Sequence, residues 1–258
     1  MYVTPQSSVQ SSESRVYNII DPDFSQRRRY FSLYDKGCLL DRVGWYSVTP
    51  ELIANQIAER CRCDTIVDAF CGVGGNAIAF AQTCEHVIAI DNNETRLRLA
   101  RHNAAIYGVA DRIEFILGDF IQFAETLSSR GKTKQGGRNV DVIFLSPPWG
   151  GPSYLQGSNQ TLSDTSGHPE FRLSDITPID GSELFKLAER ITPNIAYYLP
   201  RNTNLQEISD LVTSSEVGGT KGKEKVRMVE IEEEWMKVKL KALTCYFGGL
   251  VQGQEDLF

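Results

Sequence analysis

The chain has 258 residues, of which 41% are hydrophobic and 23% charged, so it holds enough apolar material for a folded core and lacks the composition of a disordered protein. Its 27 basic and 33 acidic residues give a net charge of −6, which disfavours a protein that coats duplex nucleic acid by bulk electrostatics. No apolar run is long enough to cross a membrane, and the N-terminal residues lack the apolar segment of a secretory signal. We therefore expect no membrane association.

The six cysteines form no Cys-x-x-Cys pair, and the three histidines show no ligand spacing with them. This pattern disfavours a zinc site, and we expect no bound metal. It favours reduced, mostly buried thiols in an intracellular protein.

Three regions differ in composition. Residues 1–15 are rich in Ser and Gln, which predicts a flexible tail. Residues 16–60 mix aromatic and arginine side chains without a clean period, which predicts an N-terminal helical extension of short helices. Its last helix is expected to have Pro50 in the first turn and Thr49 as the cap. Residues 61–258 form the predicted main domain.

The main domain alternates short apolar runs with segments of helical periodicity. Strands are expected at 65–70, 86–90, 113–117, 140–145 and 194–199, and helices at 76–82, from Asn92 or Asn93 to Gly108, at 182–191 and at 204–214. Loops are expected at 128–139, 155–177 and 215–225. Two further strands, 226–236 and 239–247, are almost continuous and should pair antiparallel. The pattern predicts an α/β fold with a doubly wound, mostly parallel sheet that the final hairpin makes mixed.

A glycine loop, which includes Gly72, Gly74 and Asn76, follows the first strand of this domain. Glycines let the chain turn tightly and let a ligand approach the backbone. Asp91 ends the second strand, where a carboxylate can accept hydrogen bonds from both hydroxyls of a ribose. The glycine spacing also fits a dinucleotide-binding fingerprint.

Two features distinguish a dinucleotide from another cofactor that carries a ribose. Asp68 ends the first strand, and a carboxylate there would repel a pyrophosphate but attract an ammonium or sulfonium cation. The antiparallel hairpin at the end of the domain is absent from ordinary dinucleotide domains. Both features favour S-adenosylmethionine and disfavour an NAD-linked oxidoreductase.

Three further residues are predicted to contact this cofactor. Asn92 directly follows Asp91, and Asp119 and Phe120 follow the third strand. At that edge a carboxylate can accept the adenine amine, while Phe120 can flank the ring. The alternative is that Gly118 and Asp119 only form a turn.

The fourth strand ends in a motif that suits a planar amine, Ser146-Pro147-Pro148-Trp149. Its place beyond the carboxyl end of a central strand puts it beside the methyl donor. The prolines remove two N–H groups, which leaves carbonyls and the Ser146 hydroxyl as hydrogen-bond acceptors. Trp149 offers a ring face for a base. The alternative is a rigid turn with a buried tryptophan.

Together these segments resemble the trimethylguanosine synthase family of RNA cap hypermethylases. The resemblance covers about residues 24–250 and is carried by the motifs at 44–51, 68–76, 88–91, 115–120, 144–151 and 198–202. It implies a class I methyltransferase with a seven-stranded mixed sheet. It also implies methyl transfer from S-adenosylmethionine to a 7-methylguanosine RNA cap, which becomes 2,2,7-trimethylguanosine.

The resemblance implies roles for single residues. Asp68 and Asp91 would hold S-adenosylmethionine, which Phe31 and Thr49 would help to cover. Trp149 would stack on the methylated base, with Ser146 and Pro147 near the reacting amine. Arg201 and Asn202 would contact the cap, with Arg201 on its phosphate. A lysine that the family has near the phosphates is missing from residues 21–24, and Arg27 with its two arginine neighbours either replaces it or forms a solvated face.

The implied partners are capped small nuclear and nucleolar RNAs, and the implied location is the nucleus or nucleolus, with some protein in the cytoplasm. We expect a monomer. Two alternatives stay open: methylation of guanine N2 or adenine N6 inside RNA, and a cap-binding scaffold without activity. The sequence leaves open whether one or two methyl groups are added.

Overall fold

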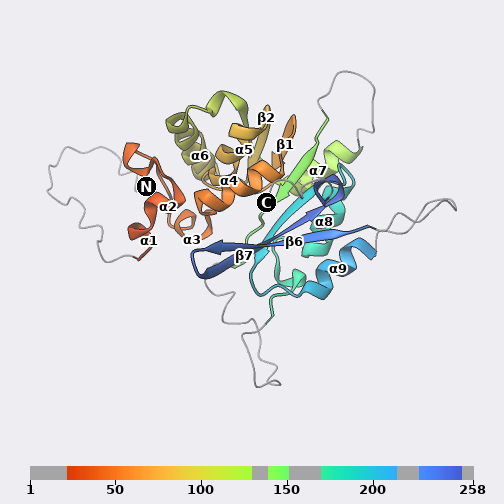
Figure 1. Cartoon of the computed structure of the whole chain (residues 1–258). Helices are drawn as coiled ribbons and strands as arrows, with labels where there is room; N and C mark the ends of the chain where they lie inside the picture. The colour runs from red at the N-terminus through yellow and green to blue at the C-terminus, as the bar shows by residue number, and fades with distance from the viewer. Residues whose placement is uncertain (1–21, 130–138, 151–169, 214–226, 252–258) are drawn as a thin grey trace, which may run out of the picture.

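The computed structural model describes residues 22–129, 139–150, 170–213 and 227–251 (Figure 1). The predicted flexible tail at 1–15 and most of the three predicted loops lie outside these ranges. All six cysteines lie within them as free thiols, and five are buried. No helix in the described ranges is long and apolar enough to cross a membrane.

Seven strands form one mixed sheet in the described part of the chain. They are β1 (Thr65–Asp68), β2 (His86–Asp91), β3 (Ile113–Leu117), β4 (Val142–Leu145), β5 (Ile195–Pro200), β6 (Val229–Met236) and β7 (Lys239–Phe247). Their order is β3-β2-β1-β4-β5-β7-β6, parallel from β3 to β5, and β7 pairs antiparallel with β5 and β6. The predicted mixed sheet with a terminal hairpin is confirmed. The strand order reverses between β1 and β4, which is where ligands bind in such sheets.

The main helices are α4 (Glu51–Arg60), α5 (Gly75–Thr83), α6 (Glu94–Tyr107), α7 (Phe120–Ser129), α8 (Gly181–Glu189) and α9 (Leu205–Thr213). The side chain of Asn93 caps α6 by accepting a hydrogen bond from the Arg96 N–H at 3.1 Å, and Gly108 ends that helix with φ 71°. The sequence analysis missed α7 and placed its last two residues in a loop.

Alternate strand residues build two hydrophobic cores, because successive side chains of a strand point to opposite faces of the sheet. Ile66 and Phe144 belong to the core with α4, α5 and α6, whereas Val67 and Ile143 belong to the core with α7, α8 and α9. Figure 1 shows these two groups of helices on opposite sides of the sheet. The carboxyl edge of the sheet is thus fixed from both faces.

The N-terminal extension consists of the short helices α1 (Pro22–Ser25), α2 (Arg27–Tyr30) and α3 (Gly44–Ser47) before α4. The Trp45 ring lies 6.1 Å from Phe24, 6.2 Å from Tyr30 and 5.7 Å from Tyr34, measured between ring centroids. Buried residues such as Phe31 join the core that α4 and α5 share with the sheet. The extension therefore packs on the main domain, and the boundary at residue 60 stays a prediction.

Candidate active site

A cleft of about 590 Å³ lies along the carboxyl edge of the sheet. Its β2 side is formed by residues that follow β1, β2 and β3, and it includes Gly72, Asn76, Asp91, Asn92 and Asp119. Its β4 side includes Ser146, Pro147 and Trp149, which follow β4, together with Tyr198 of β5 and Lys239 and Lys241 of β7. Both predicted halves of the site thus line one cavity, at the position where the strand order reverses.

On the β2 side, Asp91 organises the glycine loop. One carboxylate oxygen accepts a hydrogen bond from the Gly72 N–H at 3.0 Å, and the other accepts one from the Asn93 N–H at 2.8 Å. Gly72 has φ 53°, a left-handed conformation that glycine adopts at little cost. Burial raises the pKa of Asp91, while these N–H groups and Arg96 oppose the rise. Each oxygen keeps a second lone pair, so Asp91 can accept further hydrogen bonds from a ligand.

Asp68 lies under the floor of the cleft and is 0% exposed. Ala69 and Phe70, the next two residues, line the cleft, whereas Asp68 is not part of its lining. Neither carboxylate oxygen has a hydrogen bond of good geometry, although the N–H groups of Phe70 and Ala77 lie near enough to stabilise the charge in part. Burial raises the pKa of Asp68 to about 7, and the nearby charge of Asp91 adds to the rise. Asp68 is a buried acid that lacks a partner.

Thr49 joins the extension to the glycine loop. Thr49 was predicted to cap α4 with Pro50 in the first turn, but α4 begins at Glu51 and Pro50 takes the cap position. The Thr49 hydroxyl instead accepts a hydrogen bond from Asn76 Nδ2 at 3.0 Å. The Oδ1 atom of the same Asn76 side chain is buried and has no hydrogen-bond partner. Both residues line the cleft, as expected for residues that cover a cofactor.

Asp119 and Phe120 line the cleft but have structural partners. Asp119 Oδ1 accepts a hydrogen bond from the Ile121 N–H at 2.7 Å, at the start of α7. Phe120 is 2% exposed and packs on Phe70, with 5.9 Å between ring centroids. Little of its ring is therefore open to a ligand, and Asp119 keeps one carboxylate oxygen for an adenine amine.

Trp149 lies half-buried on the β4 side. Its ring packs on Tyr198, with 5.2 Å between centroids and 32° between planes. Tyr198 comes from β5 and is itself backed by Phe144 at 6.3 Å. Ser146 and Pro147 line the same wall. This arrangement presents a supported, half-buried aromatic plate next to hydrogen-bond acceptors, and its contact with a base stays a prediction.

Two predicted residues of the extension do not line the cleft in the described structure. Phe31 is a core residue, 2% exposed, and packs on Tyr107 at 6.1 Å. Arg27 pairs with Asp35 at 3.3 Å and lies over the Phe24 ring. The extension instead reaches the cleft through other residues, including the aromatic residues Tyr30, Trp45 and Tyr46.

Three other predicted residues also lie outside the lining. Arg201 donates a hydrogen bond to the Leu240 carbonyl at 3.3 Å, and the Asn202 carbonyl accepts one from the Phe171 N–H at 2.8 Å. Gly74 has φ 91°, and a Cβ added to it would lie 3.0 Å from the Cβ of Ala100. Gly74 therefore permits close packing of α6 against the loop rather than ligand contact.

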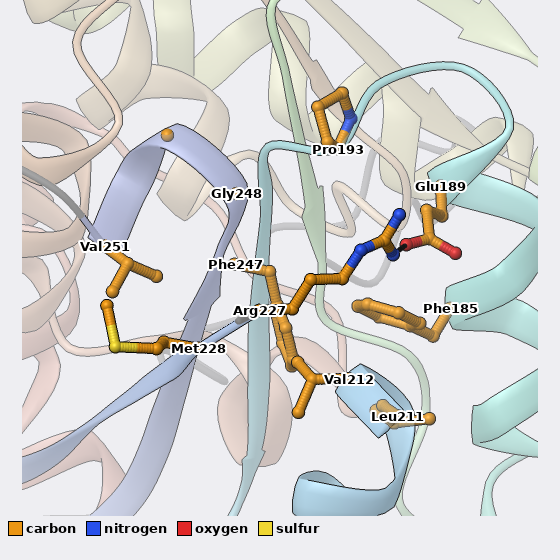
Figure 2. Close-up of a pocket in the computed structure, with 11 residues that line it drawn as sticks. Phe185, Glu189, Pro193, Leu211, Val212, Arg227, Met228, Phe247, Gly248 and Val251 are labelled. Atoms are coloured by element: carbon orange, nitrogen blue, oxygen red, sulfur yellow. Dashed lines mark hydrogen bonds and ion pairs between the residues drawn. The ribbon is translucent and has the colours of Figure 1, made fainter. Parts of the chain in front are cut away.

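Figure 2 shows a second, smaller cavity of about 270 Å³. Phe185 and Phe247 line it, and Arg227 forms an ion pair there with Glu189. Pro193, which precedes β5, also lines it, so this cavity lies at the opposite edge of the sheet from the cleft. It contains none of the predicted site residues, and we assign the active site to the larger cleft.

A family model described as RNA cap guanine-N2 methyltransferase matches residues 63–250. The chain belongs to the RNA cap guanine-N2 methyltransferase family. The trimethylguanosine synthase of Schizosaccharomyces pombe is 38% identical over 191 residues, which are 72% of each chain. That of Saccharomyces cerevisiae is 33% identical over 193 residues, which are 72% of this chain and 56% of the yeast protein. The predicted family is confirmed.

A solved structure from Porphyromonas gingivalis W83, described as a candidate methyltransferase, supports the fold of this cap methyltransferase family member. It has a TM-score of 0.56 and 15% sequence identity, and the match covers 89% of this chain and 51% of that chain. Family and fold together show an enzyme that transfers methyl groups and imply S-adenosylmethionine as the donor.

The β2 side fits that donor by its chemistry. S-adenosylmethionine carries an ammonium, a sulfonium and a ribose with two hydroxyls. Asp68 and Asn76 Oδ1 are buried acceptors without partners, and Asp91 has lone pairs to spare. A buried acceptor without a hydrogen-bond partner destabilises the protein. The cationic groups and the hydroxyl groups of S-adenosylmethionine can supply the missing partners.

The affinity for S-adenosylmethionine is expected to rise about tenfold from pH 6 to pH 8. The pKa of Asp68 without ligand is about 7, so the carboxyl is mostly protonated at pH 6 and mostly ionised at pH 8. A bound cation lowers that pKa, so binding strengthens as the pH rises. Calorimetric titration at both values measures the change, and Asp68→Asn should remove it. If the affinity of the Asp68→Asn variant still rose between pH 6 and pH 8, another group would be responsible for the pH dependence.

Proposed function

We propose that this chain transfers methyl groups from S-adenosylmethionine to the exocyclic N2 of a 7-methylguanosine cap and makes 2,2,7-trimethylguanosine. The observation that carries the proposal is the shared cleft, in which Asp91 and the Trp149 motif face one cavity. Family membership and the two trimethylguanosine synthases that resemble the chain support it.

The aromatic plate suits the base. The ring of N7-methylguanine is cationic, and an indole attracts a cation by about 0.5–2 kcal/mol. Stacking of a base on an aromatic side chain contributes about 1–3 kcal/mol. Tyr198 supports Trp149 from β5, so the indole is held before the base arrives. The described acids of the lining, Asp91 and Asp119, lie on the β2 side, where a cationic cofactor rather than the base would neutralise them.

The residues near the amine act by positioning. When bound, S-adenosylmethionine supplies an electrophilic methyl carbon on its sulfonium sulfur. Ser146 can accept a hydrogen bond from the amine, and Pro147 and Pro148 have no N–H that would compete as donors. The segment from Ser146 to Trp149 holds no ionisable base, so the amine would gain the methyl group and a positive charge first and would then release its proton to water. Correct alignment of the amine can lower the barrier by several kcal/mol, up to roughly 7–11.

The deciding experiment is methyl transfer to three substrates: an m7GpppG dinucleotide, unmethylated GpppG and uncapped RNA. We expect mass spectrometry to show products one and two methyl groups heavier from m7GpppG only. Equal turnover of uncapped RNA would instead favour methylation inside RNA. Binding of m7GpppG without any mass gain, in the presence of S-adenosylmethionine, would favour a scaffold.

We further propose that the substrates are capped small nuclear and nucleolar RNAs, and that a monomer acts in the nucleus or nucleolus and partly in the cytoplasm. This proposal rests on the trimethylguanosine synthase resemblance. Sequencing of RNA that cross-links to the tagged chain, microscopy of the same chain and sedimentation of the pure protein test its three parts. Cross-linking to uncapped RNA alone would contradict the first part.

A further inference from the structure

Two cysteine thiols face each other at the edge of the sheet opposite the cleft. Cys63 precedes β1, and Cys84 follows the last residue of α5 just before β2. Their Sγ atoms lie 3.8 Å apart. Cys63 is the one cysteine of the chain that is not buried, whereas Cys84 is 2% exposed. The methyl-transfer site does not use this pair, because the cleft lies at the carboxyl ends of the same strands.

The backbone around the two cysteines is arranged as in neighbouring strands. β1 and β2 are parallel with Thr65 paired to His86, so Cys63 and Cys84 each lie two residues before a paired residue. The pairing extends beyond the strand ends, since the His86 N–H donates to the Asp64 carbonyl at 2.9 Å. Cys84 is itself extended, with φ −106° and ψ 156°. Neighbouring strands lie about 4.8 Å apart, which falls within the Cα separation of about 4.4–6.8 Å that a disulfide accepts.

The surroundings favour one thiolate in the pair. A hydrogen bond from the Cys63 thiol lowers the pKa of Cys84, while burial opposes the fall. The charge of Arg62 lowers the same pKa further, and Arg62 is held nearby because its guanidinium donates to the Thr83 carbonyl at 3.3 Å. The shared hydrogen bond and burial raise the pKa of Cys63. The thiolate is the reactive form in thiol–disulfide exchange, so Cys84 can act as base toward Cys63 and as nucleophile toward its sulfur.

We propose that Cys63 and Cys84 form a redox modification site, which a small disulfide such as oxidised glutathione converts to an intramolecular disulfide bond. Cys63 is the thiol that such a molecule reaches, since Cys84 is buried. In the first step Cys63 Sγ bonds to one glutathione sulfur, its proton passes to the Cys84 thiolate, and one glutathione leaves as its thiolate. Cys84 then releases that proton to solvent, attacks Cys63 Sγ and expels the second glutathione thiolate. Two protein sulfurs are oxidised, and one glutathione disulfide is reduced to two thiols.

The bond connects two positions between which the cofactor-binding part of the chain lies. The segment from Cys63 to Cys84 contains β1, the glycine loop with Gly72, and α5. A bond that closes this segment lowers the conformational entropy of the unfolded chain and so stabilises the folded state. It forms at the amino edge of the sheet, away from the cleft. Oxidation therefore stabilises this segment without blocking the site.

The test treats the full reduced chain with oxidised glutathione and compares four proteins. They are the wild type, Cys63→Ser, Cys84→Ser and the matched control Cys38→Ser. Cys38 is 1% exposed and donates a hydrogen bond to the Leu33 carbonyl at 3.5 Å, which a serine hydroxyl can also donate. Mass spectrometry of the intact and the digested chain identifies the bond. Thermal unfolding with and without a reducing agent measures its effect.

We expect the wild type and Cys38→Ser to lose two hydrogen atoms and to yield a linked peptide pair that joins Cys63 to Cys84. Cys84→Ser should instead keep one glutathione on Cys63, while Cys63→Ser should do neither, since its remaining thiols are buried. The oxidised wild type should unfold at a temperature about 5–10 °C above that of the reduced form. Cys63→Ser should unfold at the same temperature with and without the reducing agent.

A wild-type chain that stays reduced, under conditions that oxidise a dithiol peptide, would overturn the inference. Linkage of Cys84 to Cys61, whose carbonyl lies 3.6 Å from Cys84 Sγ, would overturn it as well. A lower unfolding temperature of the oxidised wild type would also contradict it, because the bond would then strain the fold. Methyl transfer enters none of these measurements, so the proposed function is tested separately.

Discussion

Trp149→Ala is expected to weaken binding of 7-methylguanosine by roughly 10- to 1,000-fold, because the variant loses both stacking and the attraction between the indole and the cationic ring. The affinity for S-adenosylmethionine should not change, since the residues that suit the cofactor lie on the β2 side of the cleft. Methyl transfer to m7GpppG should fall at least as far as binding does.

Calorimetry with each ligand measures this result without relying on tryptophan fluorescence. Trp235→Ala is the matched control, since Trp235 is 50% exposed on β6 and does not line the cleft. It should bind both ligands as the wild type does. Normal cap methylation by the Trp149 variant would show that another surface holds the base.

Most of the fold and the central motifs of the site could be read from the sequence, because they depend on local signals. The five parallel strands are short apolar runs, and the acid that ends β2 follows directly from its run. The Ser146 motif is likewise contiguous. A parallel sheet brings the carboxyl ends of its strands to one edge, so Asp91 and Trp149 could be placed together without coordinates.

The helix α7 was missed although its signal is present in the sequence. Asp119 is a favourable N-terminal residue, and Phe120, Phe123, Ala124 and Leu127 follow at helical spacing. The residues after β3 were interpreted as ligand contacts, and that interpretation concealed the helix. In the structure Asp119 has two roles: one carboxylate oxygen caps α7, and the residue also lines the cleft.

The two arginines predicted to contact phosphate do not line the cleft in the described part of the chain, and the reason is different. Arg27 and Arg201 carry the right charge, but their partners, Asp35 and the Leu240 carbonyl, come from other elements. No local sequence pattern predicts that Lys239 lines the cleft, because its position there depends on the antiparallel pairing of β7 with β5. Long-range pairing of this kind is not encoded in local spacing.

Asp91→Ala is expected to lower the affinity for S-adenosylmethionine at least about 100-fold, because two hydrogen bonds to a charged acceptor contribute about 1.5–3 kcal/mol each. The variant also loses the bonds that the carboxylate accepts from the N–H groups of Gly72 and Asn93. The glycine loop is then no longer held to the end of β2, which lowers the affinity for S-adenosylmethionine further. Asp91→Asn keeps the shape and one acceptor, so its loss should be smaller.

Asp64→Ala is the matched control for this variant, since Asp64 is an exposed acid that precedes β1 at the opposite edge of the sheet. Calorimetry with S-adenosylmethionine, calorimetry with 7-methylguanosine and thermal unfolding separate a local effect from a general one. The Asp91 variant should keep its affinity for 7-methylguanosine, the reverse of the Trp149 variant. If both ligands were lost together while the fold survived, the two sides of the cleft would be one binding site, and the separation of cofactor from base would be wrong.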